Sequence, residues 1–124
     1  MTRTARELRL PVADAPAEGS TRLLDIGGVR VGLFRVGGDL HALADRCPHR
    51  GAPLCSGRVT TPVAYESGEL SLGPRASVLR CPWHKWEFDI ATGRCLVDEK
   101  LRVRTYDVRV EGDQIVVSLD RLGP

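Results

Sequence analysis

Short runs of alternating or continuous apolar residues lie toward both ends of the chain and predict β-strands there. They cover residues 20–26, 29–36 and 39–44 in the first half, and 102–110 and 115–119 near the other end. Gly-Gly pairs at 27–28 and 37–38 separate the first three runs, and glycine supplies the positive φ that tight hairpins need. No stretch longer than two turns shows the 3.6-residue period of a helix. The pattern predicts an all-β fold.

The middle of the chain, about residues 45–97, has a different character. It is rich in Pro, Gly, Cys and Trp and holds all four cysteines and two of the three histidines. We expect an antiparallel β-sandwich or open barrel, formed by residues 1–44 and 98–124, into which a smaller loop-built subdomain is inserted. Within the insertion, residues 60–75 predict a short hairpin with its turn near 67–69. That hairpin is interpreted as surface decoration, the favoured alternative, or as an element that caps the metal site or docks a partner.

Composition narrows the class of protein. The chain has 124 residues, enough for one domain, with 42% hydrophobic and 27% charged residues, which is ordinary for a globular protein. A formal charge of +2 is too small to indicate nucleic acid or an anionic membrane as partner. No apolar run is long enough to span a bilayer, and the N-terminal residues show no export signal. The prediction is a cytoplasmic protein, in which cysteines are metal ligands or free thiols rather than disulfides.

Two stretches carry the candidate chemistry: CPHRGAPL at 47–54 and CPWHKWEFDIATG at 81–93. In each, a proline follows the cysteine and stiffens a turn that ends in a histidine one or two residues on. Together the turns offer Cys47, His49, Cys81 and His84, two sulfur and two nitrogen donors. The residues alone leave two metals open. One is a tetrahedral Zn²⁺, and the other is a 2Fe–2S cluster with thiolates on one iron and imidazoles on the other.

The two motifs strongly resemble those of the Rieske iron–sulfur family, C-x-H followed after a spacer by C-x-x-H. The resemblance implies a [2Fe–2S] cluster in which Cys47 and Cys81 bind the buried iron, while His49 and His84 bind the outer one. It also implies a cluster-binding subdomain set in an all-β base.

The residues around the motifs indicate which branch of that family the chain resembles. High-potential members have two further cysteines that bridge the loops, but the matching positions here are Ala52 and Trp83. Those members also place Ser and Tyr hydroxyls near the cluster sulfurs, where this chain has Trp86 and Phe88. Fewer hydrogen bonds to sulfur stabilise the reduced state less. The resemblance is therefore to the low-potential, oxygenase-ferredoxin branch.

Cys55 and Cys95 raise the alternative of a four-cysteine cluster. Their spacing to the other two cysteines matches neither ferredoxin pattern, and such a cluster would leave both motif histidines unexplained. We expect both to be free, partly buried thiols, because a disulfide between them is disfavoured in a reducing compartment.

The expected function is transfer of single electrons. Substrate chemistry in this family needs a second, mononuclear iron held by two histidines and a carboxylate, and only His41 remains once the motif histidines are used. We therefore expect a stand-alone ferredoxin component of an oxygenase system, not an enzyme by itself. A reductase would be its electron donor and an oxygenase or other oxidoreductase its acceptor. The alternatives are a permanent small subunit of a larger reductase, resembling that of nitrite reductase, and a zinc-binding interaction module.

Basic residues flank both motifs. If exposed, they would form a rim that steers an acidic redox partner; the plainer interpretation is a solvated loop surface, because Asp45, Glu87 and Asp89 lie among them. The residues concerned are Arg46, Arg50, Arg58, Arg80 and Lys85.

Overall fold

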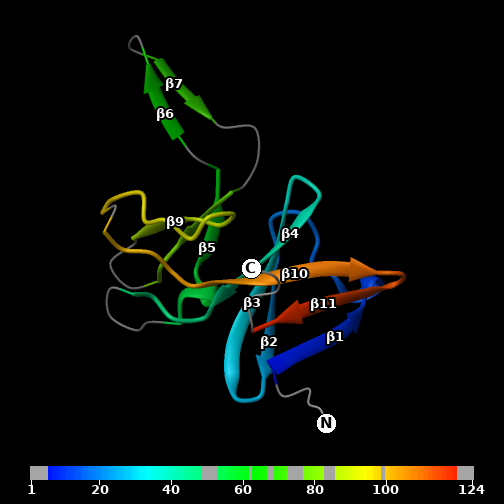
Figure 1. The fold of residues 1–124 in the computed structure, drawn as a ribbon. Coiled ribbons are helices and arrows are strands. Elements are labelled where there is room, and N and C mark those ends of the chain that lie inside the picture. Colours follow the sequence, from blue (N-terminus) through cyan, green and yellow to red (C-terminus); the bar gives the residue numbers. More distant parts are fainter. Residues whose placement is uncertain are drawn as a thin grey trace.

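The computed structural model describes residues 6–48, 53–61, 63–66, 69–72, 77–82, 86–98 and 100–119, and the regular secondary structure in this part of the chain consists of β-strands and two short 3₁₀ turns (Figure 1). The predicted all-β class is confirmed. In chain order the elements are β1 (Glu7–Pro11), the 3₁₀ turn η2 (Val12–Asp14), β2 (Thr21–Ile26), β3 (Val29–Val36), β4 (Asp39–Ala44), the 3₁₀ turn η3 (Leu54–Ser56), β5 (Arg58–Thr60), β6 (Val63–Glu66), β7 (Glu69–Leu72), β8 (Val78–Arg80), β9 (Glu87–Asp89), β10 (Thr105–Glu111) and β11 (Gln114–Ser118).

The largest sheet has six antiparallel strands in the order β1-β11-β10-β4-β3-β2. The hairpins β2–β3 and β3–β4 turn at the two Gly-Gly pairs. Gly37 and Gly38 have φ of 60° and 88°, values that L side chains rarely adopt, so the predicted turns are confirmed. Two differences from the prediction stand out. The strand β1 lies outside the predicted strands, although Leu8 and Leu10 alternate with Glu7 and Arg9 as they would in a half-buried strand, and β10 begins at Thr105 rather than at 102.

The middle segment contains more regular structure than the sequence predicts. Instead of loops alone, it contains a three-stranded antiparallel sheet in the order β5-β8-β9. The hairpin expected within residues 60–75 is present as β6 and β7, which pair from Val63↔Leu72 to Glu66↔Glu69. Figure 1 shows that this hairpin extends away from the two larger sheets. No helix among the described residues is long and apolar enough to cross a membrane.

Two hydrophobic cores lie on opposite sides of β3 and β4. Alternate side chains of a strand point to opposite faces, so Val31 and Leu33 join the core inside the six-stranded sheet, whereas Phe34 and Val36 join a second core. This second core also contains Leu43 and side chains from η3, β8 and β9. The strands β3 and β4 are therefore buried on both faces. The segment that carries the two motifs packs against one face of these strands.

Candidate metal centre

The first motif loop leaves β4 at Ala44 and returns at η3. Asp45 closes the base of this loop, since its backbone N–H donates to Arg30 O (3.0 Å) and its Oδ1 accepts from the Cys55 N–H (2.8 Å). Its Oδ2 lies 3.4 Å from Arg30 Nε, and the carboxylate side chain is only 1% exposed. The sequence-based interpretation of Asp45 as a solvated surface charge is therefore wrong. A buried carboxylate needs such partners to offset its desolvation, and here they join the two ends of the loop.

The second motif loop connects β8 to β9. These strands pair through Arg80 and Glu87, whose side chains also form an ion pair at 2.9 Å between Nη2 and Oε2. Directly inside that pair, the Cys81 N–H donates to Trp86 O at 2.7 Å. Backbone hydrogen bonds and an ion pair therefore close the base of this loop, and they fix Cys81 at its first position.

Gly57 holds the two loops against each other. It follows η3, and the next residue, Arg58, pairs with Arg80 across β5 and β8. A Cβ at Gly57 would lie 1.9 Å from the carbonyl oxygen of Arg80, so only glycine allows this approach. Nothing in the sequence pattern singles out Gly57, because it stands outside both motifs and its φ of −76° marks no special turn.

Cys47 and Cys81 both lie in the second core. Each is 1% exposed, and both belong to the same buried cluster as Leu54 and Phe88. All four cysteines of the chain are buried free thiols in this core, so the prediction of free Cys55 and Cys95 is confirmed, although they are more fully buried than expected.

The sulfur of Cys55 makes contacts that suit a protonated thiol rather than a metal ligand, and the sulfur of Cys95 has a hydrogen-bond donor within its own loop. The Sγ of Cys55 lies 3.7 Å from Ala44 O and 3.8 Å from Leu43 O, and Cys95 Sγ accepts from the Asp98 N–H at 3.4 Å. Among the residues that the structure describes, no group of three or more His, Cys, Asp and Glu side chains could hold a metal ion. The four-cysteine alternative therefore has no support there.

Burial, and then the nearby Asp45 carboxylate, raises the pKa of the Cys55 thiol well above its ordinary 9.0. A thiol that is harder to ionise in the folded state stabilises the fold fully below pH 9, and this contribution is lost as the pH rises toward the folded-state pKa. We expect wild-type protein to lose about 1 kcal/mol more of its free energy of unfolding between pH 9 and pH 10 than Cys55→Ala does. Urea unfolding at the two pH values measures this, and equal losses would contradict it.

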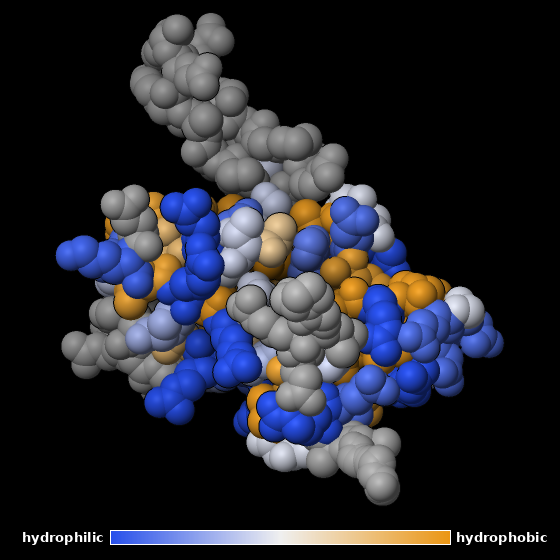
Figure 2. Space-filling view, in the orientation of Figure 1, coloured by the Kyte–Doolittle hydropathy of each residue, from blue (hydrophilic) through white to orange (hydrophobic). Residues whose placement is uncertain are grey.

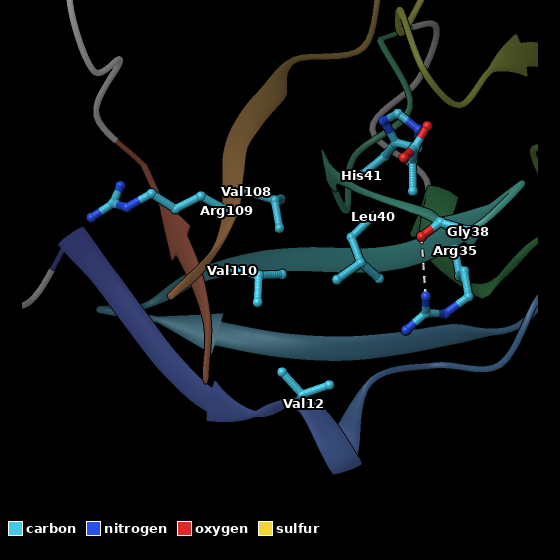
Figure 3. Close-up of a pocket in the computed structure, with 9 residues that line it drawn as sticks. Val12, Arg35, Gly38, Leu40, His41, Val108, Arg109 and Val110 are labelled. Atoms are coloured by element: carbon cyan, nitrogen blue, oxygen red, sulfur yellow. Dashed lines mark hydrogen bonds between the residues drawn. The ribbon is translucent and has the colours of Figure 1, made fainter. Parts of the chain in front are cut away.

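The motif histidines His49 and His84 lie outside the described residues. His41, the third histidine, is on β4, where it borders a groove of about 480 Å³ between β4 and β10 (Figure 3). Val12, Val108 and Val110 also line this groove, whereas Cys47 and Cys81 do not. His41 therefore takes no part in bringing the motif cysteines together.

Comparison with known proteins agrees with this geometry. The family model described as "Rieske [2Fe-2S] domain" matches residues 8–107, and the chain belongs to that family. It is 33% identical over 115 residues to the 3-phenylpropionate/cinnamic acid dioxygenase ferredoxin subunit of Escherichia coli (strain K12), covering 92% of this chain and 93% of that protein.

Solved structures show the same fold. The ferredoxin of carbazole 1,9a-dioxygenase from Nocardioides aromaticivorans IC177 aligns with a TM-score of 0.69 and 26% identity, over 93% of this chain and 99% of that one. A structure described as a nitrite reductase NADPH small subunit aligns with a TM-score of 0.65 and 24% identity, over 90% and 96%. The chain is accordingly a one-electron carrier with a Rieske-type [2Fe–2S] cluster.

The residues present fit such a cluster. Two thiols that are not oxidised to a disulfide lie in one apolar core, and the two loops that carry them are fixed to each other at Gly57. Soft thiolate donors in an apolar setting are the environment that iron–sulfur clusters require.

Proposed function

We propose that Cys47, His49, Cys81 and His84 are the four ligands of the cluster, and that the chain is a ferredoxin component of an oxygenase system. The supporting observation is that the cysteines of the two motifs, Cys47 and Cys81, lie in the same buried core. The remaining donors of the two motifs are histidines, as the Rieske ligand set requires. When bound, the cluster accepts and releases one electron. The chain's residues hold it rigid and exclude water from its cysteine side.

The proposed partners follow from the relatives. Two of the similar proteins named above are ferredoxins of dioxygenases, so we assign a reductase as electron donor and an oxygenase as acceptor. Only His41 remains outside the motifs, so the chain performs no substrate chemistry itself. The proposed compartment is the cytoplasm. We divide the single domain into a β base of residues 1–44 and 98–124 and a cluster-binding part of about 45–97.

The surroundings of the cysteines support a low reduction potential. Phe88 is fully buried in the core that contains Cys47 and Cys81, and Trp86 packs against the same core. Neither side chain has a hydroxyl that could donate to a cluster sulfur. We expect a potential in the lower part of the Rieske range of roughly −150 to +300 mV.

The decisive experiment is an EPR spectrum of anaerobically purified protein before and after dithionite reduction, with metal analysis of the same sample. We expect about two irons per chain and a signal only after reduction, with the low average g-value of imidazole-ligated clusters. A colourless, EPR-silent protein with one zinc would refute the proposal. Gel filtration of the native protein distinguishes a stand-alone ferredoxin from a subunit that co-purifies with a larger reductase.

A further inference from the structure

The segment that follows β9 runs antiparallel beside it and brings exposed side chains close to the second motif loop. Cys95 and Phe88 form an antiparallel backbone β-bridge, and the Leu96 N–H donates to Glu87 O at 2.8 Å. One step further along this register brings Val97 level with Trp86, the residue that accepts the Cys81 N–H. Leu96 and Val97 therefore lie at the base of the loop that carries Cys81 and His84.

Both side chains face solvent. Leu96 is 53% and Val97 68% exposed, the latter the most exposed large apolar residue in the described part of the chain. Isolated exposed apolar residues are common, but an adjacent pair beside a redox centre is the kind of small apolar contact that protein partners cover.

Arginines lie on the far side of this apolar pair from the loop. The backbones of Arg94 and Arg102 pair in an isolated antiparallel β-bridge. Both side chains are exposed, as is that of Arg104, two residues further on. None of the three has a carboxylate within ion-pair distance in the described residues. Asp89 also lines the cleft beside Arg94, and its Oδ2 already accepts hydrogen bonds from the Thr92 N–H and Oγ1. Figure 2 shows strongly hydrophilic and hydrophobic side chains together over the segment drawn yellow and orange in Figure 1.

Three arginines of the six-stranded sheet have partners of their own. Arg9 and Arg109 pair with Glu7 and Glu111 across β1, β11 and β10, and Arg35 donates to backbone carbonyls. Charged residues are also unevenly distributed along the chain. Residues 45–104 hold ten of the 18 Lys and Arg but seven of the 16 Asp and Glu, so the excess of positive charge lies in this stretch, which includes Arg94, Arg102 and Arg104.

We infer that Arg94, Leu96, Val97 and Arg102, here called the 94–102 surface, form a docking site for an acidic face of the protein that exchanges electrons with this chain. The inference rests on the proposed electron-carrier function. The apolar pair supplies the close contact near the cluster, and the two arginines steer an acidic partner and set its orientation.

The test is the rate of electron transfer from flavodoxin hydroquinone, an acidic one-electron donor protein, measured by stopped flow at low and high salt. We expect Arg94→Glu and Arg102→Glu each to lower the low-salt rate about three- to tenfold, because charged rim residues act mainly on the association rate. The difference should largely disappear at high salt. Arg22→Glu on β2 makes the same charge change at an exposed residue of the base and should leave the rate within about twofold of wild type.

A second pair of variants tests the apolar contact. Val97→Ser should lower the rate at both salt concentrations, whereas Val110→Ser, which changes a valine that is 57% exposed on β10, should not. Equal effects of Arg94→Glu and Arg22→Glu, or of the two valine variants, would overturn the docking site. Failure of the proposed electron-carrier function would be recognised separately. In that case the wild-type protein would contain no iron, or no cluster that can be reduced, before it is mixed with flavodoxin.

Discussion

Replacing either motif cysteine with alanine should yield protein that lacks iron. Cys47 and Cys81 are both buried in the second core, and each is the one thiol of its motif. We expect the iron content of Cys47→Ala and Cys81→Ala to fall to about a tenth of wild type or less, with loss of the EPR signal, because cluster binding requires every thiolate ligand. Metal analysis and EPR of the purified variants measure this.

The other two cysteines provide matched controls in the same core. Cys55→Ala and Cys95→Ala remove similarly buried thiols and should each cost about 1–2 kcal/mol of stability through the small cavity left behind. Both should nevertheless retain about two irons per chain. If Cys55→Ala or Cys95→Ala lost the cluster while Cys47→Ala kept it, the assigned ligand set would be wrong. Circular dichroism of all four variants separates loss of iron from loss of fold.

The sequence predicts the parts of this protein that rest on local rules. Alternating apolar residues and Gly-Gly turns correctly predict β2, β3 and β4, because a hairpin needs only its own pattern and turn chemistry. The paired Cys-Pro-(x)-His turns likewise indicate a metal site with two sulfur and two nitrogen donors, and their resemblance to the Rieske motifs implies the cluster type.

The sequence does not predict features that depend on long-range packing. Asp45 lies among charged loop residues, and only the fold shows that Cys55 N–H and Arg30 converge on its buried carboxylate. The short strands β5, β8 and β9 have three residues each, too few for periodicity to reveal them. They pair because the second core forms beneath them, which is a tertiary effect.

Gly57→Ala should disrupt the cluster although residue 57 binds no metal and belongs to neither motif. The new Cβ would lie 1.9 Å from Arg80 O and 2.9 Å from the Arg80 carbonyl carbon. Both atoms are backbone, so the clash is relieved only if β8 and the adjoining Cys81 move away from η3. Overpacking of this kind destabilises a fold by about 3 kcal/mol. It would also separate the two loops whose cysteines must reach the same cluster, so iron content should fall to about half or less.

A second glycine distinguishes this mechanism from general loss of stability. In the β10–β11 turn, Gly112 has a φ of 64°, and a Cβ added there would meet no atom within 4 Å, so Gly112→Ala strains only the local backbone. That strain should cost about 1–2 kcal/mol and leave iron content and the EPR spectrum unchanged. If Gly57→Ala matched Gly112→Ala in iron content and spectrum, the close approach at Arg80 would not be what holds the loops in register. Loss of iron in Gly57→Ala at a temperature where both variants remain folded would show that the spacing of the loops sets cluster binding.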